Sequence, residues 1–221
     1  MEPVDACGSI PDIVLNSEKL YEGDLSFYFK MICKNARNLT NPYHNFSHMF
    51  NVTWLCYQAC IFYKDMLTPV EMRILLISAM WHDFNHSGKM GDDYLNIEQA
   101  VEGVKNYITP EDRKYLATIC EIIKATEFPH KIPSKSLPLL MQIIRDANVA
   151  QAFSTTWIQQ VIFGLSKEWN KDPTEILAAQ CPFLSNLDFS TEWAQQRYPE
   201  RVVKAKIAEA NALLKLMRGI A

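Results

Sequence analysis

Three helix-start patterns constrain the fold of this chain more than any other feature. They are Thr68-Pro69-Val70-Glu71, Thr109-Pro110-Glu111-Asp112 and Asp172-Pro173-Thr174-Glu175. In each pattern a Thr or Asp side chain can cap the first turn, proline suits the first helical position, and an acidic residue follows near the positive end of the helix dipole. An apolar run comes after each one. We therefore predict three helices that begin at these points, the first ending near Trp81.

Other segments also begin with helix signals. The chain has only 7 glycines, and alternating strand-like runs bounded by turns are scarce. We expect further helices at about 45–64, 93–107, 139–147, 155–169 and 200–217. The predicted fold class is all-α, a compact helical bundle. With 221 residues, 48% of them hydrophobic, the chain can fill one core. We expect one domain at 26–221, preceded by a loosely held N-terminal arm at 1–25.

Charge and cysteine content exclude several classes of protein. A net charge of −3 gives no broad attraction to nucleic acid or to an anionic membrane, so neither partner is expected. No apolar stretch reaches the roughly 18 residues that span a bilayer, and the first 20 residues lack a signal-peptide pattern. The 6 cysteines are scattered through apolar helical patterns, as expected in a reducing compartment. These features predict a soluble cytoplasmic protein. They give no signal on oligomeric state.

Four of the 5 histidines lie in two short stretches. His44 and His48 are four residues apart, and so are His82 and His86, so each pair shares one face if its backbone is helical. Imidazole and carboxylate together suit borderline and hard divalent ions, and Asp83 follows His82 directly. The alternative is that His44 and His86 are exposed polar residues at helix ends and that His82-Asp83 is a local cap. Both pairs together favour a metal site.

Such a site needs a further carboxylate downstream, for which Asp146 is the best candidate. It lies late in the apolar run 139–147, where an unpaired aspartate is costly to bury. A metal ion would compensate that cost. The alternative is a surface ion pair with Arg145 or a lysine.

The order His48, His82-Asp83, Asp146 is similar to the H...HD...D order of the HD superfamily of metal-dependent phosphohydrolases. A closer resemblance is to the class I 3',5'-cyclic nucleotide phosphodiesterases, whose pattern contains YHN-x-x-H and HD-x-x-H-x-G. The matching residues are Tyr43-His44-Asn45 with His48, and His82-Asp83 with His86 and Gly88.

Further segments extend the resemblance over about 41–187. Ala125-Thr126-Glu127-Phe128 resembles the family's A-T-D-M, and Asp146-Ala147-Asn148 falls where its last metal-binding aspartate should be. Ala179-Gln180-Cys181-Pro182-Phe183-Leu184 resembles the S-Q-x-x-F segment that holds the purine. The family's N-x-F-L after Gly88 is not matched, because residues 89–95 have a different sequence.

The resemblance implies an enzyme that uses two divalent ions, drawn from zinc, manganese, magnesium and iron. His48, His82, Asp83 and Asp146 are the implied ligands of the first ion, and Asp83 bridges to the second. A bound ion would lower the pKa of a water and supply hydroxide near neutral pH. That hydroxide would attack the phosphorus of a 3',5'-cyclic nucleotide, such as cAMP or cGMP, and give the 5'-monophosphate.

The resemblance also implies roles for residues that hold no metal. His44 is the candidate general acid for the leaving alkoxide, because a positioned imidazolium donates well near neutral pH. His86 and Glu98 would orient the waters of the second ion or the ring of His44. The implied contacts with the small-molecule nucleotide are Tyr43, Asn45, Gln180 and Phe183.

Two other functions fit the same residues less well. One is an HD-type phosphohydrolase that acts on nucleoside monophosphates or triphosphates, but triphosphates call for clustered Arg and Lys, and none stands out near the implied ligands. The other is a non-catalytic interaction module that keeps a metal for stability alone. A purely structural site would not need the free acid His44.

Overall fold

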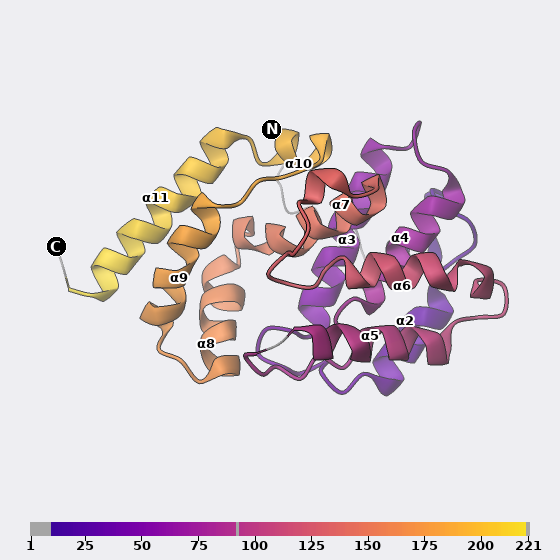
Figure 1. The fold of residues 1–221 in the computed structure, drawn as a ribbon, viewed down its shortest axis with the longest axis horizontal. Helices are drawn as coiled ribbons and strands as arrows, with labels where there is room; N and C mark the ends of the chain where they lie inside the picture. The colour runs from indigo at the N-terminus through magenta and orange to yellow at the C-terminus, as the bar shows by residue number, and fades with distance from the viewer. Residues whose placement is uncertain (1–9, 92, 220–221) are drawn as a thin grey trace.

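The computed structural model describes residues 10–91 and 93–219, and within them it contains helices and no strand. The prediction of an all-α fold is confirmed (Figure 1). The α-helices are α1 Ile10–Leu15, α2 Ser26–Asn35, α3 Phe46–Phe62, α4 Pro69–Trp81, α5 Tyr94–Tyr107, α6 Leu116–Lys124, α7 Leu139–Val149, α8 Phe163–Trp169, α9 Pro173–Ser185, α10 Glu192–Arg197 and α11 Glu200–Met217. Short 3₁₀ turns occupy Arg113–Tyr115, Ser134–Ser136 and Ala150–Phe153, and a π-helical turn, Ile158–Ile162, leads into α8.

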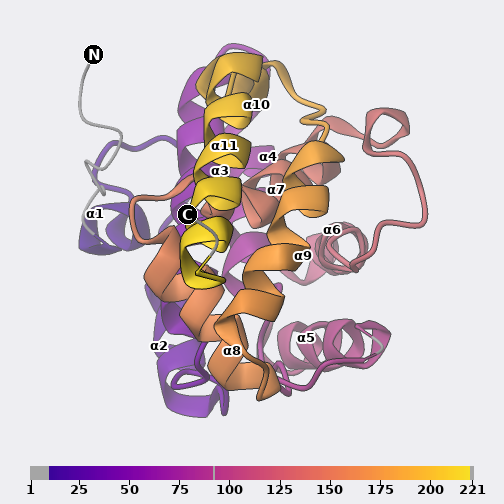
Figure 2. The same ribbon diagram turned by 90° about the vertical axis from the view of Figure 1, so that its left-hand side faces the viewer.

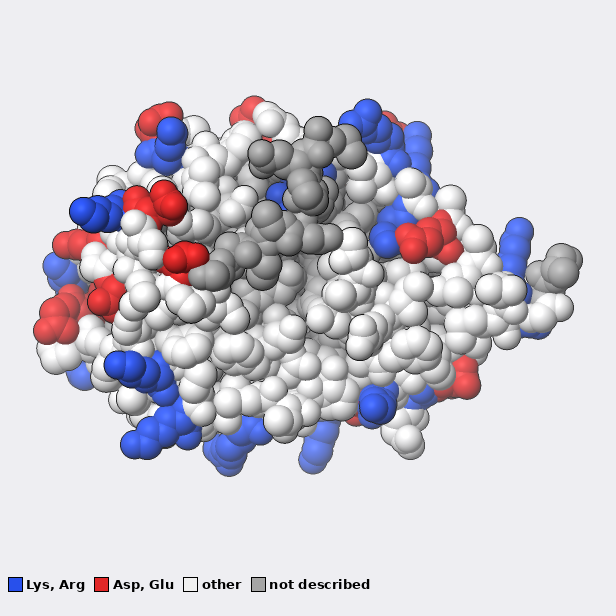
Figure 3. All heavy atoms as spheres, turned by 180° about the vertical axis from the view of Figure 1, so that it is seen from behind, with Lys and Arg blue, Asp and Glu red and all other residues white. Residues whose placement is uncertain are grey.

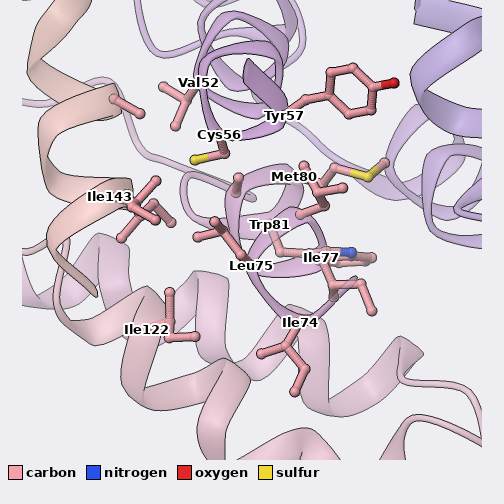
Figure 4. Close-up of a cluster of buried hydrophobic side chains, with 14 of the residues drawn as sticks. Val52, Cys56, Tyr57, Ile74, Leu75, Ile77, Met80, Trp81, Ile122 and Ile143 are labelled. Atoms are coloured by element: carbon pink, nitrogen blue, oxygen red, sulfur yellow. The ribbon is translucent and has the colours of Figure 1, made fainter. Parts of the chain in front are cut away.

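Helix α4 lies at the centre of the larger hydrophobic core, which we call the main core. It begins with the expected capping box, in which Thr68 and Glu71 bond each other's backbone N–H groups. Leu75, Leu76 and Ile77 are all 0% exposed, so the helix is covered on every side. Figure 4 shows this region, with Val52 and Cys56 of α3, Ile122 of α6 and Ile143 of α7 around α4. The rigid setting fixes where the C-terminal end of α4 lies.

A second, smaller hydrophobic cluster is formed by the π-turn and helices α8, α9 and α11, and we call it the minor core. Leu177, Leu184 and Ala210 are its most buried members. Helices α9 and α11 lie side by side along their lengths in both ribbon views (Figures 1 and 2). The Asp172 cap predicted for α9 is confirmed, because its side chain accepts a hydrogen bond from the Thr174 N–H at 2.8 Å.

The N-terminal segment differs from the expected loose arm. Residues 1–9 lie outside the described residues, but residues 10–25 pack onto the main core. Ile13 is 2% exposed, Tyr21 3% and Leu25 0%. The Tyr21 hydroxyl donates to the Ile13 carbonyl, and the Asn16 amide donates to the carbonyls of Tyr21 and Gly23. These side chains bury apolar area that a mobile arm would leave in water. A boundary at residue 25 stays a prediction.

The helix start at Thr109 is also modified. Thr109 does accept from the Asp112 N–H at 3.3 Å, but a 3₁₀ turn follows and α6 begins only at Leu116. The Asp112 side chain forms a bidentate ion pair with Arg73, at 2.9 and 2.7 Å, and accepts a hydrogen bond from the Tyr28 hydroxyl at 2.7 Å. The predicted cap at Thr109 therefore forms, but the turn that it starts also carries a tertiary ion pair, and α6 begins after that turn.

The surface carries charges of both signs. On the face seen in Figure 3, lysine, arginine and acidic side chains lie mainly around the edge, and the middle is largely uncharged. Among the described residues, no helix combines the length and the apolar character that a membrane crossing requires.

Candidate active site

Helices α3 and α4 bring three predicted metal ligands together. His48 lies in the first turn of α3, and His82 and Asp83 follow the last residue of α4. Asp83 Oδ2 is 3.2 Å from His48 Nε2 and 3.4 Å from His82 Nε2, and the two Nε2 atoms are 3.4 Å apart. All three side chains are buried. We call these residues the cation cluster.

Neighbouring groups fix the tautomers of both rings in the cation cluster. His48 Nδ1 donates to Gln151 Oε1 at 2.6 Å, and His82 Nδ1 donates to the Ala79 carbonyl at 2.8 Å. The Gln151 amide is itself oriented, because its Nε2 donates to Gln160 Oε1 at 2.5 Å. Both Nε2 lone pairs therefore face the Asp83 carboxylate, as second-shell partners arrange in metal-binding histidines.

The electrostatics of the cation cluster favour a bound positive charge. Asp83 Oδ2 is a buried oxygen with no hydrogen-bond donor. Burial alone would raise the pKa of Asp83, but its electrostatic interactions with His82 and His48 outweigh burial and hold this pKa well below its usual range. Burial would lower the pKa of His82, yet Asp83 beside it raises it. A divalent cation fits this arrangement, because two imidazoles and one carboxylate are common ligands of zinc, iron and manganese.

A second cluster lies beside the first and contains His44, His86 and Glu168. His44 Nδ1 pairs with Glu168 Oε1, while Glu168 Oε2 accepts from the backbone N–H groups of Tyr43 at 2.8 Å and His44 at 2.9 Å. The rings of His44 and His86 stack, with centroids 3.7 Å apart and planes 15° apart. Glu168 thus fixes both the backbone and the ring of His44.

The tautomer of His86 makes a metal in the second cluster unfavourable. Its Nδ1 accepts from the Gly88 N–H at 3.0 Å, so its Nε2 carries the hydrogen and points toward Asp93 Oδ1, 3.8 Å away. No lone pair of His86 is left for a cation. This cluster is therefore better suited to hold a proton than a metal.

The close approach of α8 makes the contact between Glu168 and His44 possible. A Cβ atom on Gly164 would lie 2.9 Å from the Pro42 carbonyl oxygen and 3.3 Å from Tyr43 Cβ. Gly164 and Glu168 are one helical turn apart and share a face. The missing side chain at 164 therefore lets α8 press against the loop that carries His44.

Both clusters open into one cavity of about 440 Å³. One wall carries His44, His48, Asp83 and His86. A second part of the wall comes from the minor core and is mainly apolar, with Val161, Leu165, Trp169, Ile176, Gln180 and Phe183. The volume suits a small ligand of about nucleotide size. A cation cluster, a buried histidine paired with a glutamate and an apolar wall thus face the same space.

Comparison with known proteins identifies the family. The model of the family described as 3'5'-cyclic nucleotide phosphodiesterase matches residues 43–156. The chain belongs to this phosphodiesterase family. The match contains both histidine pairs and all three residues of the cation cluster.

Individual relatives are distant. The mouse (Mus musculus) high affinity cGMP-specific 3',5'-cyclic phosphodiesterase 9A is 25% identical over 104 residues, which are 44% of this chain and 18% of the mouse protein. The 3',5'-cyclic-nucleotide phosphodiesterase regA of Dictyostelium discoideum is 30% identical over 89 residues, 39% of this chain and 11% of regA. The chain therefore spans less than a fifth of the length of either relative.

A solved structure extends the likeness of the fold beyond the matched segments. The structure of LmjPDEB1 in complex with IBMX has a TM-score of 0.65 with this chain at 16% sequence identity. The alignment covers 96% of this chain and 87% of the other. Helices of the minor core, which follow residue 156, are therefore part of the shared phosphodiesterase fold.

Asp146 does not reach the cation cluster, although the sequence predicts it as a metal ligand. It accepts from the Ser190 N–H and hydroxyl, each at 3.1 Å, and from the Thr191 N–H and hydroxyl at 2.8 and 2.7 Å. The hydrogen bonds lower the pKa of Asp146, but burial raises it more, so the net shift is upward. Asn148, two residues later, has its Oδ1 3.1 Å from His48 Nε2 instead. Positions two apart on a helix point about 200° apart, so only one of them can face the cluster.

Two other predicted residues lie outside the cavity wall. Asn45 caps α3, because its side chain accepts from the His48 N–H at 3.1 Å and donates to the Asn41 carbonyl at 2.8 Å. Glu98 lies half-buried on α5 and does not line the cavity, whereas Asn96 does. Its electrostatic influence reaches Cys120 and Lys124 of α6. The structure thus gives Asn45 a role in placing His48 and leaves Glu98 outside the cavity wall.

The remaining predicted contacts do line the cavity. Tyr43, Gln180 and Phe183 are all on its wall. Gln180 Oε1 accepts from Trp157 Nε1 at 3.4 Å, so the amide N–H groups are free to face a ligand. Phe183 meets Phe128 edge to face, with centroids 6.1 Å apart.

Sequence reasoning missed Glu168, Asn148 and Gln151. Glu168 carries no local signal, because it lies 124 residues from His44 and follows an ordinary helical pattern. Asn148 and Gln151 could have been found, since they are two amides three residues apart just after the apolar run 139–147, where residues at this spacing share one helical face.

Proposed function

We propose that this chain hydrolyses a 3',5'-cyclic nucleotide to the 5'-monophosphate, and that the cation cluster and His44 carry the reaction. The observation that supports this most is the position of a buried cation cluster and a glutamate-paired histidine on the same wall of a nucleotide-sized cavity. The substrates in the relatives' names, cGMP and cyclic nucleotides, point the same way.

Metal dependence follows from the donor set. His48, His82 and Asp83 present two lone pairs and an unpaired carboxylate oxygen to one point. A divalent ion held there would make a water nucleophilic near neutral pH and would neutralise charge on the phosphoryl group. We propose zinc, manganese, magnesium or iron as the metal. A second ion would share Asp83 and be held mainly by waters.

His44 is the proposed general acid. Glu168 holds its Nδ1, so Nε2 is the atom that can donate a proton to the leaving ribose oxygen. Burial lowers the pKa of His44, although Glu168 and Asp83 oppose this effect. A bound phosphodiester anion would add negative charge nearby and favour the protonated ring.

The apolar wall is the proposed site of the base. Phe183 offers a ring for stacking, and the N–H groups of Gln180 can donate to a purine acceptor. Lys89 is the one Lys or Arg on the cavity wall within the described residues. Triphosphate recognition normally uses several such cations, so this wall favours a singly charged phosphodiester over a nucleoside triphosphate.

Free thiols support a reducing location. Among the described residues the cysteines are unpaired: Cys33, Cys56, Cys60, Cys120 and Cys181. We propose that the chain acts in the cytoplasm, where thiols of this kind remain reduced.

An activity screen tests the proposal. The purified chain, supplied in turn with Mn²⁺, Mg²⁺ and Zn²⁺, is assayed with cAMP, cGMP, bis-p-nitrophenyl phosphate and nucleoside mono- and triphosphates. We expect release of the 5'-monophosphate from at least one cyclic nucleotide and its loss in EDTA. The matched control is Asp83→Asn, which keeps the shape of the side chain and removes the charge. Hydrolysis of triphosphates alone, or of nothing in any metal, would overturn the proposal.

A further inference from the structure

The fourth side of the cation cluster is formed by an amide. Asn148 lies near the C-terminal end of α7 and lines the cavity, and its Oδ1 is 3.1 Å from His48 Nε2. His48 Nε2 carries a lone pair because Nδ1 is the donor to Gln151. Asn148 Oδ1 and Asp83 Oδ2 both lie beside this nitrogen, at 3.1 and 3.2 Å, so the amide is close enough to share a cation that the nitrogen holds. Asn148 therefore points to the same cation as the other three residues.

The nearby carboxylate is not available for this position. Asp146 is 3% exposed, and Ser190 and Thr191 at the start of α10 satisfy both of its oxygens. Thr191 is the N-cap of α10, so Asp146 joins α7 to the beginning of that helix. Turning Asp146 toward the cavity would break these bonds and leave the two backbone N–H groups without an acceptor.

We propose that Asn148 supplies the fourth protein ligand, so that one divalent ion is held by two imidazoles, one carboxylate and one neutral amide oxygen. This inference rests on the metal dependence proposed above. The ligands then carry a single negative charge. A neutral amide binds a cation less strongly than a carboxylate, and two imidazoles favour zinc or iron over magnesium. The predicted site is therefore weaker than one with a second carboxylate, and selective against magnesium.

Direct metal binding tests the proposal without reference to activity. The full chain is titrated with Zn²⁺ and with Mg²⁺ by isothermal calorimetry, as the wild type and as Asn148→Asp, Asn148→Ala and Asp146→Asn. We expect Asn148→Asp to lower the Kd for Zn²⁺ roughly tenfold or more, because ligand charge tunes affinity over orders of magnitude. Asn148→Ala should raise the Kd. Asp146→Asn should lower the melting temperature and leave the Kd unchanged.

Asn186→Asp is the matched control, because it adds the same charge at an exposed position at the end of α9. Its Kd should equal that of the wild type. An unchanged Kd in Asn148→Asp, an equal gain in Asn186→Asp, or a large loss of affinity in Asp146→Asn would each overturn the proposal. If Asp146→Asn does not fold, Thr191→Ala is a milder variant, because it removes the hydroxyl donor to Asp146 and keeps the backbone N–H donor, and it should give the same result.

The result of the metal titration can be interpreted separately from the result of the activity screen. If no cyclic nucleotide is hydrolysed but Asn148→Asp tightens Zn²⁺ binding, the amide ligand stands and the substrate proposal fails. If hydrolysis is observed but Zn²⁺ affinity does not respond to position 148, the substrate proposal stands and the amide ligand fails.

Discussion

The two walls of the cavity come from regions that are held together in different ways. The wall with the histidines is carried by α3, the end of α4 and the adjoining loops, and its polar atoms have fixed partners: Gln151 for His48, Ala79 for His82 and, from α8, Glu168 for His44. The second wall belongs to the minor core and consists mainly of apolar side chains, with Gln180 as its chief polar group. Groups that perform chemistry need exact positions, whereas an apolar wall tolerates changes of shape. This contrast predicts that the reaction depends on the first wall and the choice of base on the second.

The largest effect is expected from Asp83→Ala, on the histidine wall. The variant removes the charge that holds the cation, so we expect bound metal to be lost and kcat to fall by about 10³-fold or more. Metal analysis and steady-state kinetics check this. Retention of full activity would mean that the reaction does not depend on the histidine wall.

His44→Ala should have the next largest effect. The ring donates a proton and holds no metal in this arrangement, so kcat should fall by about 10²-fold while the Kd for metal stays the same. Calorimetry and kinetics on the same sample separate the two quantities. A parallel loss of metal would place His44 among the ligands instead.

Glu168→Gln tests whether the pairing of Glu168 with His44 controls the pKa of His44. The contact with Glu168 raises the pKa of His44 against the lowering effect of burial, so its loss should lower that pKa further. The acid form of His44 is the active one, so kcat falls as pH rises through this pKa. The descending limb of the profile should move to lower pH in Glu168→Gln, with a loss of about tenfold at pH 7. An unshifted profile would reduce Glu168 to a purely structural residue.

Gln180→Ala and Phe183→Ala, on the apolar wall, should have the smallest effects on the reaction itself. Each should raise KM by about tenfold, because one stacking or hydrogen-bonding group is lost, and should leave kcat within about twofold. Steady-state kinetics with cAMP and cGMP measure both constants. A fall in kcat with unchanged KM would show that Gln180 or Phe183 takes part in the chemistry.

The sequence predicts the main core better than it predicts the cavity. The capping box at Thr68 and the apolar run after it determine α4 locally, and so the position of His82 and Asp83 follows from neighbouring residues. The partner of His44 does not, because Glu168 lies on a helix that meets His44 only through tertiary packing. Asp146 shows the remaining limit: the residue type fits a metal, but helical phase turns it toward α10. The face of a helix on which a side chain lies cannot be read from its residue type alone.

The contact between α8 and the loop that carries His44 depends on the absence of a side chain at Gly164. A methyl group there would strike the Pro42 carbonyl and force α8 away from the loop. The carboxylate one turn further along would then withdraw from its imidazole, and the proton donor would lose its support although neither member of the pair had changed. Gly164 has no functional group of its own, yet it determines whether Glu168 can contact His44. The pH profile of Gly164→Ala should therefore resemble that of a Glu168 variant more than that of a core mutation.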